Sequence, residues 1–476
     1  MPYNAHSRLA RIKKLIPMKN SSNTKDLTGY RSSHRRMWAI AGPAILANSS
    51  APLVGLVDTW AVGHLPSAVH LASVGLGSVV FNYIFWAFGF LRMGTTGLVA
   101  QAWGAGDERR LTAEVVRGSA LAVFFGIMLL LFQTQILELA MRAMAPPQAV
   151  ESITAEYFNI RIWAAPASLM VFAISGVLFG LGKTRSILLL QLVLNISNGL
   201  LNLLFVIGLD MGVPGVALGT LIAQWLTAAL GVWQITKIIT YKSLLEGLRS
   251  GQTWLLSRFR RVLMINGFIF VRTVFLMTAI SMIMRISGSM GEVDMAASHI
   301  VSQFMLLMAL GLDGFAHAVE ALAGKAWGEG QKKNFRRWVG LSLIWGGISS
   351  VAYALLFWIA GSGITAVLTD IEAVRLTVNH LMPLVIALPL VSVWAYQFDG
   401  VYIGATAASA MMVTMILSFA VYLAVLTPMT KAWGLSGLWG AVLIFMGIRG
   451  VFQALWYPRL EAQISPPENP AESSRV

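Results

Sequence analysis

The amino-acid sequence predicts an all-α polytopic membrane protein whose twelve transmembrane helices form two pseudo-symmetric six-helix bundles. Of the 476 residues, 57% are hydrophobic and only 12% are charged, whereas about a quarter are charged in an ordinary soluble domain. The apolar residues come in runs of about 20 or more, and each run can cross the ~30 Å hydrocarbon core of a bilayer. One short segment also returns with few changes in the second half of the chain, which indicates an internal repeat.

Hydropathy windows of about 19 residues place the membrane helices one after another along the chain. The first six are expected at 37–62, 71–101, 115–137, 157–181, 186–208 and 214–239. Six more are expected at 262–286, 295–324, 338–361, 381–405, 409–427 and 435–457. Every span should be a helix, because an open sheet or a bare loop would leave backbone groups unsatisfied in lipid.

These spans divide the chain into five parts. We expect a basic tail at 1–36, an N-lobe at 37–240, a linker at 241–261, a C-lobe at 262–457 and a Pro-containing tail at 458–476. The first 36 residues hold nine Lys or Arg and no long apolar core, which excludes a cleavable signal peptide. The C-terminal tail is expected to be disordered.

The net charge of +14 follows topology. Lys and Arg concentrate in the N-terminal tail and in the connections on its side of the membrane, such as Arg258, Arg260 and Arg261. The positive-inside rule therefore predicts that both termini are cytoplasmic, in an inner-membrane protein. No nucleic-acid partner is needed to explain the basic charge.

Several classes of chemistry are disfavoured. The chain has no cysteine, and its seven histidines are not clustered at metal-ligand spacing, so we expect no metal site, no redox cofactor and no enzyme activity. The Gly-rich stretches lack the lysine of a Walker motif, so no ATP site is expected. Any pumping must then draw on an ion gradient.

The two halves of the chain repeat each other. Leu98–Gly106 reads LVAQAWGAG and Leu322–Gly330 reads LAGKAWGEG, 224 residues later. Gly176 and Gly180 recur at Gly400 and Gly404 with the same offset. Because each half holds six spans, both enter the membrane in the same orientation, and an axis along the membrane normal should relate them. Two such bundles predict a cleft that opens alternately to each side; a channel or an inert scaffold is the alternative.

Asp58 is the leading candidate for a functional residue. It lies in the first predicted span, about four turns beyond Pro43, a residue that should bend that helix. Burial disfavours the charged form of a carboxylic acid, so such a group can take up and release a proton near neutral pH. The alternative is a carboxylate near the helix end, wetted by the short loop at 63–65.

Neutral polar residues gather in the fifth and sixth spans. Asn198 and Asn202 are four residues apart and share one helix face, and Thr220 follows in the next span. Such amides and hydroxyls can hold a carboxylate, complete an oxygen shell around a hard cation, or simply join helices to each other.

The second half carries charges at membrane depth. Asp313, His317 and Glu320 share one helix stripe, and Asp399 and Arg272 lie in neighbouring spans. Opposite charges should pair there, so a structural ion-pair network within the C-lobe is as strong an interpretation as a role in transport.

Methionines concentrate in the seventh and eighth spans. Met277, Met305 and Met308 are candidates for a substrate cleft, because flexible thioethers suit promiscuous binding surfaces. Contact with lipid or with neighbouring helices is the alternative for each of them.

The motifs of the chain resemble those of the multidrug and toxic compound extrusion (MATE) family, and within it the DNA-damage-inducible protein F (DinF) subfamily. The resemblance rests on GLVDTWAVGHL, FLRMGTTGLVAQAWGAG, RIWAAPASL, NGFIFVRT, LDGFAHAVEALAGKAWG and FDGVYIGAT, in this order from the first span to the tenth. It implies two lobes of six helices and antiport of amphipathic, often cationic, organic compounds against protons or sodium.

Carried over to this chain, the resemblance places the family's first-helix aspartate on Asp58, its kink proline on Pro43 and its polar cluster on Asn198, Asn202 and Thr220. The sequence departs from the family at Asn202, where an aspartate is often found, and at Phe268, where related proteins often have an acid. One carboxylate then remains in the N-lobe, which favours protons as the coupling ion, with sodium as the alternative.

The sequence thus predicts a proton-coupled multidrug antiporter. Its expected partners are amphipathic small molecules and membrane lipids, and it is expected to be a monomer. A sodium-coupled antiporter and a flippase for lipid-linked substrates, which the wider superfamily includes, are the alternatives. Asp58 is expected to couple ion binding to transport, with Glu320 and Asp399 shaping the other lobe.

Overall fold

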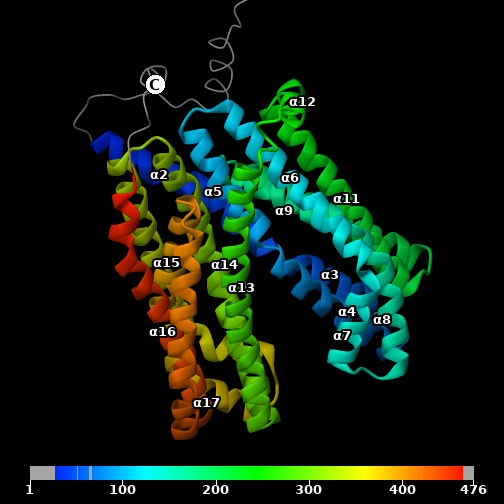
Figure 1. The fold of residues 1–476 in the computed structure, drawn as a ribbon. Coiled ribbons are helices and arrows are strands. Elements are labelled where there is room, and N and C mark those ends of the chain that lie inside the picture. The colour runs from blue at the N-terminus through cyan, green and yellow to red at the C-terminus, as the bar shows by residue number, and fades with distance from the viewer. Residues whose placement is uncertain (1–26, 51, 64–66, 465–476) are drawn as a thin grey trace, which may run out of the picture.

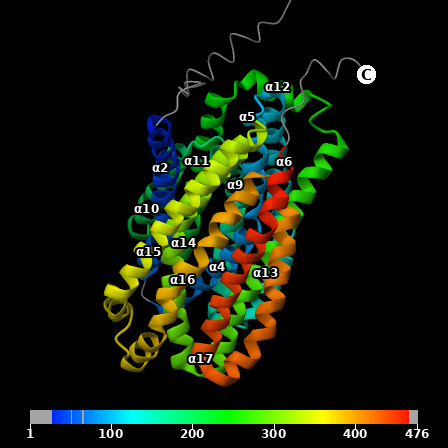
Figure 2. The same ribbon diagram turned by 90° about the vertical axis from the view of Figure 1, so that its left-hand side faces the viewer.

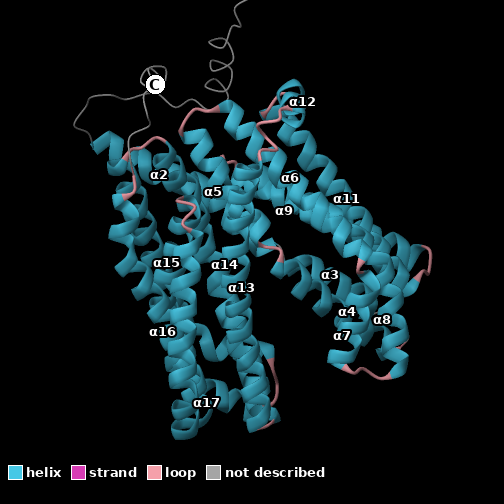
Figure 3. Ribbon diagram, viewed as in Figure 1, coloured by secondary structure: helices cyan, strands magenta, loops and turns pink. Residues whose placement is uncertain are grey.

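The computed structural model describes residues 27–50, 52–63 and 67–464, and every regular element within them is a helix (Figure 3). The predicted all-α membrane class is confirmed by eleven described helices that are long and apolar enough to cross a membrane. The helices of the first half are α2 (Leu27–Ser50), α3 (Pro52–Gly63), α4 (Ala68–Ala87), α5 (Phe90–Gly104), α6 (Glu108–Leu131), α7 (Gln133–Met144), α8 (Gln148–Arg161), α9 (Ala165–Gly180), α10 (Thr184–Asn202) and α11 (Gly212–Ile238).

The second half contains fewer and longer helices. They are α13 (Leu256–Met290), α14 (Glu292–Gly328), α15 (Lys332–Leu368), α16 (Glu372–Gly404) and α17 (Ala408–Ala462), and a short helix, α12 (Tyr241–Arg249), lies in the predicted linker. As a straight helix, the 55 residues of α17 would be about 80 Å long, more than twice the membrane core.

α17 is in fact two helices that meet at a sharp turn. Gly434 has φ 55° and ψ −130°, which is not helical. The two parts run side by side (Figure 2), and the rings of Tyr422 and Phe445 lie 5.3 Å apart across them. Because α17 counts as two helices, the eleven candidate membrane helices contain twelve spans, which is the number predicted.

Several helices begin or bend at other places than predicted. α2 starts at Leu27, ten residues before the predicted first span, so part of the expected tail is helical. α2 also continues through Pro43 without a break. α2 ends at Ser50 and α3 begins at Pro52, and together they make one candidate membrane span, Ser32–Thr59.

The ends of the chain are only partly described. The helix α17 includes Pro458, so the predicted C-terminal tail starts later than expected. The rest of that tail, 465–476, and residues 1–26 of the N-terminal tail lie outside the described residues. The start of α2 and the end of α17 lie at the same end of the molecule, here called the termini side (Figure 1).

The helices form two lobes with separate apolar cores. One core includes Phe81, Phe158 and Leu169 of the first half, and another includes Phe304, Phe357 and Trp439 of the second. The two lobes meet near α5 and α14 and diverge away from the termini side (Figure 1). α2, a helix of the first half of the chain, also packs against the C-lobe, because Met37 and Ala41 lie in a cluster with Phe315 of that lobe.

The repeat is visible in the packing. A Cβ atom on Gly176 would lie against the Arg92 carbonyl, and one on Gly400 against the Ala316 carbonyl, so both contacts keep the 224-residue offset. Across the lobes, a Cβ on Gly104 would overlap the Lys325 carbonyl, and one on Gly328 would overlap the Gln101 carbonyl. These reciprocal contacts show that α5 and α14 approach each other around a pseudo-twofold axis.

Candidate functional site

Asp58 is buried inside the N-lobe. It lies in the middle of α3 and is 3% exposed. Its Oδ1 accepts a hydrogen bond of 2.7 Å from Nδ2 of Asn202 on α10. The low exposure of this side chain favours the interpretation of a buried acid over that of a solvated helix end.

The predicted polar residues lie together around this carboxylate. Nδ2 of Asn198 donates to the hydroxyl of Thr220 at 3.0 Å, and that hydroxyl donates to the Val216 carbonyl on its own helix. Both side chains also interact electrostatically with Asp58. The Oδ1 atoms of Asn198 and Asn202 are buried without a hydrogen-bond partner. The cluster therefore holds two oxygens that can accept a proton donor or bind a cation.

The end of α10 positions this cluster. Directly after Asn202, the chain continues as a π-helical turn at Leu203–Gly208, and such turns are frequent at functional sites. Gly219 on α11 lies against the Asn202 side chain, where a Cβ atom would overlap Oδ1. The absence of a side chain at Gly219 thus lets α11 approach the amide.

Arg161 belongs to the same region, which the sequence reasoning missed. The guanidinium of this α8 residue donates to the hydroxyl of Tyr157 and lies 4.7 Å from the centre of the Phe81 ring. Its charge acts on Asp58. The fourth span, expected at 157–181, includes Arg161, but no role was assigned to this residue. α8 starts at Gln148, nine residues earlier than predicted, and Arg161 is half-buried at its C-terminal end.

In the C-lobe, Asp399 is the centre of an ion-pair cluster. It accepts from Arg272 on α13, and from Arg449 (2.8 Å) and Gln453 (2.6 Å) on α17. Arg272 is 6% exposed and Arg449 is 4% exposed. The predicted pairing of Arg272 with Asp399 is present, whereas Arg449 and Gln453 were not anticipated.

Glu320 is paired with the other lobe as well as with a residue of the C-lobe. Its Oε2 lies 3.2 Å from Nη1 of Arg92 on α5, and its Oε1 lies 3.1 Å from Nδ1 of His317. The expectation of a network confined to the C-lobe is thus corrected for Glu320, because α14 packs directly on α5. Asp313 is half-buried and makes no hydrogen bond or ion pair with another described residue.

The methionine prediction needs a correction. Met308 is fully buried in the C-lobe core, and Met305 packs against that core. Met308 therefore fills space between helices and does not line a cleft in this conformation. Met277 on α13 is half-buried.

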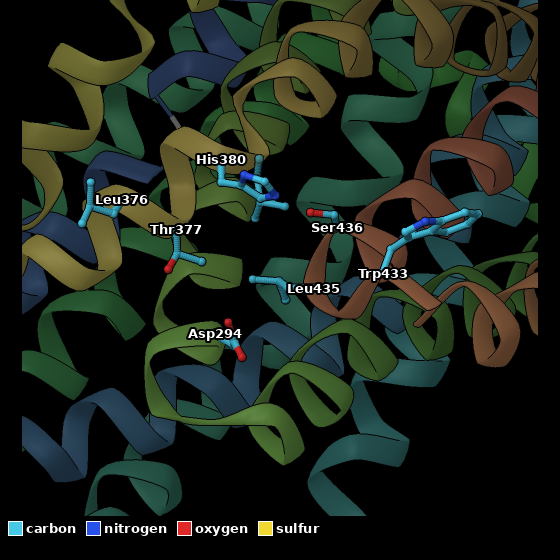
Figure 4. A pocket seen from close by; sticks show the side chains of 8 residues that line it. Asp294, Leu376, Thr377, His380, Trp433, Leu435 and Ser436 are labelled. Atoms are coloured by element: carbon cyan, nitrogen blue, oxygen red, sulfur yellow. The ribbon is translucent and has the colours of Figure 1, made fainter. Parts of the chain in front are cut away.

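One described pocket lies elsewhere. It has a volume of about 360 Å³ and is formed by Asp294, Thr377, His380 and Trp433 with the neighbouring Leu376, Leu381, Leu435 and Ser436 (Figure 4). These residues come from α14, α16 and the turn of α17. The pocket is thus within the C-lobe and distant in the fold from the Asp58 cluster.

The fold and the buried polar groups define a class of membrane protein. Two helical lobes related by an internal repeat, with ionisable residues at membrane depth, are the architecture of secondary transporters. Residues 43–207 and 270–429 match the model of the MatE family. The chain therefore belongs to the MatE family of multidrug efflux transporters, as the motifs predicted.

Individual relatives agree with this assignment. The chain is 34% identical over 427 residues to DNA damage-inducible protein F of Escherichia coli K12, covering 89% of this chain and 92% of the relative. It is 27% identical over 439 residues to the chloroplastic protein DETOXIFICATION 44 of Arabidopsis thaliana, covering 86% and 80%. The structure of the Vibrio cholerae MATE transporter VcmN in its bent form superposes with a TM-score of 0.80 at 19% identity, covering 91% and 98%.

Proposed function

We propose that the protein is a proton-coupled antiporter that exports amphipathic organic compounds from the cytoplasm by alternating access. The observation that carries this proposal is a carboxylate, Asp58, buried at 3% exposure and held by a neutral amide. An ionised group in this environment is costly unless it is neutralised. Proton uptake by Asp58 removes that cost and changes the hydrogen bonding between α3 and α10.

Both protonation states of Asp58 have hydrogen-bond partners nearby. The ionised carboxylate accepts from Nδ2 of Asn202. The neutral acid has an O–H group to donate, and the unpartnered Oδ1 atoms of Asn198 and Asn202 are buried acceptors in the same cluster. Coupling then requires only that substrate binds better to the protein with Asp58 ionised. Substrate binding and protonation of Asp58 then oppose each other, and each lowers the affinity of the protein for the other.

A sodium ion is the second candidate for the coupling ion. The same two amide oxygens, together with the carboxylate, are oxygen ligands of the kind that hard cations prefer. Asn202 stands where an additional carboxylate would bring a second negative charge, and its neutrality favours the proton.

Transport into proteoliposomes tests the proposal. We expect uphill movement of a cationic or anionic amphiphile when a pH gradient is imposed, and loss of this movement in Asp58→Asn. Asp210→Asn is the matched control, since Asp210 is exposed and its backbone φ of 51° suits asparagine. Wild-type rates in Asp58→Asn would disprove the mechanism.

The other outcomes identify the alternatives. Transport driven by a sodium gradient alone would make sodium the coupling ion. Movement of lipid-linked oligosaccharides that is indifferent to Asp58 would indicate a flippase. A protein that moves no amphiphile uphill under either gradient would be a channel or a scaffold.

A further inference from the structure

One buried ion pair joins the two lobes at membrane depth. Nη1 of Arg92 on α5 lies 3.2 Å from Oε2 of Glu320 on α14, and the two side chains are 18% and 2% exposed. The partners come from opposite halves of the internal repeat. They also come from the two helices whose glycines, Gly104 and Gly328, make the reciprocal close contacts between the lobes.

Aromatic and imidazole rings enclose this ion pair. The Arg92 guanidinium lies 5.3 Å from the centre of the Phe179 ring on α9, and the His317 ring lies 4.2 Å from the same ring. Nδ1 of His317 is 3.1 Å from Oε1 of Glu320 and 3.4 Å from Nη1 of Arg92. A carboxylate so enclosed is weakly screened by solvent, so separating it from Arg92 leaves charge in a medium of low dielectric constant.

The internal repeat does not account for the ion pair. At the offset of 224 residues, Arg92 corresponds to Ala316 and Glu320 corresponds to Thr96. The hydroxyl of Thr96 donates to the carbonyl of Arg92 on its own helix, so it makes no equivalent link between the lobes. The repeat therefore explains why α5 and α14 approach each other closely. It does not explain the ion pair, because the charges are present on one side of the pseudo-twofold axis only.

We propose that Arg92 and Glu320 form a lock that holds the lobes together on the termini side and must break before the molecule opens there. The inference of a lock rests on the proposed alternating-access function, and it assigns a role in that function to Arg92 and Glu320. Removing either charge leaves the other without its oppositely charged partner in the other lobe, so it raises the free energy of the closed state relative to an open one.

Distance measurements between the lobes test the lock. The natural chain has no cysteine, so Ala105→Cys and Lys333→Cys can carry spin labels on exposed sites of the two lobes. In Glu320→Gln and in Arg92→Gln we expect the population with long distances on the termini side to grow at least about fivefold, the lower end of measured coupling effects. The double variant Arg92→Glu with Glu320→Arg should restore the short distance.

Arg142→Gln is the matched control, because Arg142 pairs with Glu138 within α7 at an exposed position. It should leave the distances unchanged. Unchanged distances in both single variants, or failure of the charge exchange to restore the short distance, would overturn the proposal. Restoration by the exchange also excludes a misfolding effect of the single variants.

The two proposals can fail separately. If amphiphile transport depends on Asp58 but the distances between the lobes do not change in the Arg92 and Glu320 variants, the antiporter proposal stands and the lock is wrong. If the distances respond as expected but no gradient drives transport, the lock describes the lobes of a protein with another function.

Discussion

At the scale of single residues, the buried carboxylates are compensated in two different ways. Asp399 meets two arginines and Glu320 meets an arginine and a histidine, whereas Asp58 is held directly by an amide. A carboxylate between guanidinium groups has its negative charge balanced by theirs. Asp58 is hydrogen-bonded by a neutral amide, and Arg161, whose charge acts on it, makes no ion pair with it, so a change of its own charge breaks no ion pair. This difference supports the proposal that Asp58 is the coupling residue.

The amide of Asn202 can be tested directly. Asn202→Leu keeps the approximate size of the side chain and removes the donor to Asp58. A hydrogen bond to a charged group contributes about 1.5–3 kcal/mol, so we expect the initial rate of coupled transport to fall by roughly tenfold or more. Asn195→Leu is the control on the same helix, since Asn195 donates to the Ser50 carbonyl and not to Asp58. Equal rates in the two variants would contradict the assigned role of Asn202.

The residue scale also shows how far sequence patterns reach. The shared face of Asn198 and Asn202 follows from helical periodicity alone. The contacts of Arg161 could not be read in the same way, because its partner Phe81 lies on another helix, α4, and the spacing within α8 does not show which helix packs there.

At the scale of helices, small residues determine how closely the lobes approach. Gly104 and Gly328 make reciprocal contacts with backbone carbonyls of the opposite helix.

Gly106, Gly182 and Gly330 adopt positive φ angles of 66–68°, and Thr406, at the repeat position of Gly182, has φ 55°. A threonine is strained in this conformation, and its hydroxyl accepts a hydrogen bond from Gln101 across the lobes.

Adding a methyl group at the crossing should destabilise the protein. Gly104→Ala forces α5 away from α14, because the new Cβ atom would overlap the Lys325 carbonyl. Overpacking of this kind costs about 1–3 kcal/mol, which thermal unfolding followed by tryptophan fluorescence would register as a lower Tm.

Gly340→Ala is the control for this substitution. Gly340 lies within α15, and nothing is within 4 Å of its added Cβ atom. We expect an unchanged or slightly higher Tm, since alanine is the better helix former. A Tm of Gly104→Ala equal to that of Gly340→Ala would show that the helix crossing tolerates a side chain.

At the scale of the whole molecule, several features of the fold lie at the same end. The start of α2, the end of α17, the linker helix α12 and the contacts between α5 and α14 all lie on the termini side (Figure 1). The basic connections belong to this side, which predicts that it faces the cytoplasm. If this side faces the cytoplasm, the conformation with the lobes joined here is closed toward the cytoplasm.

Cysteine labelling in cells tests this orientation. Gly251→Cys places a thiol on the linker, and Asp370→Cys places one on the exposed connection between α15 and α16. A membrane-impermeant thiol reagent should label Asp370→Cys in intact cells, and Gly251→Cys only after the membrane is permeabilised. Labelling in the reverse order would place the termini outside the cytoplasm.

The sequence by itself determined the membrane class, the number of spans and the repeat. These features depend on hydrophobicity, helical period and spacing along the chain. The grouping of Asp58 with Asn198, Asn202 and Thr220 was implied by the family resemblance. Only the tertiary structure decided that Glu320 meets Arg92, that Asp399 meets Arg449, and that Met308 lies in the core. Such meetings depend on how helices cross, and ridges and small residues on several helices must fit together before two distant side chains come within bonding distance.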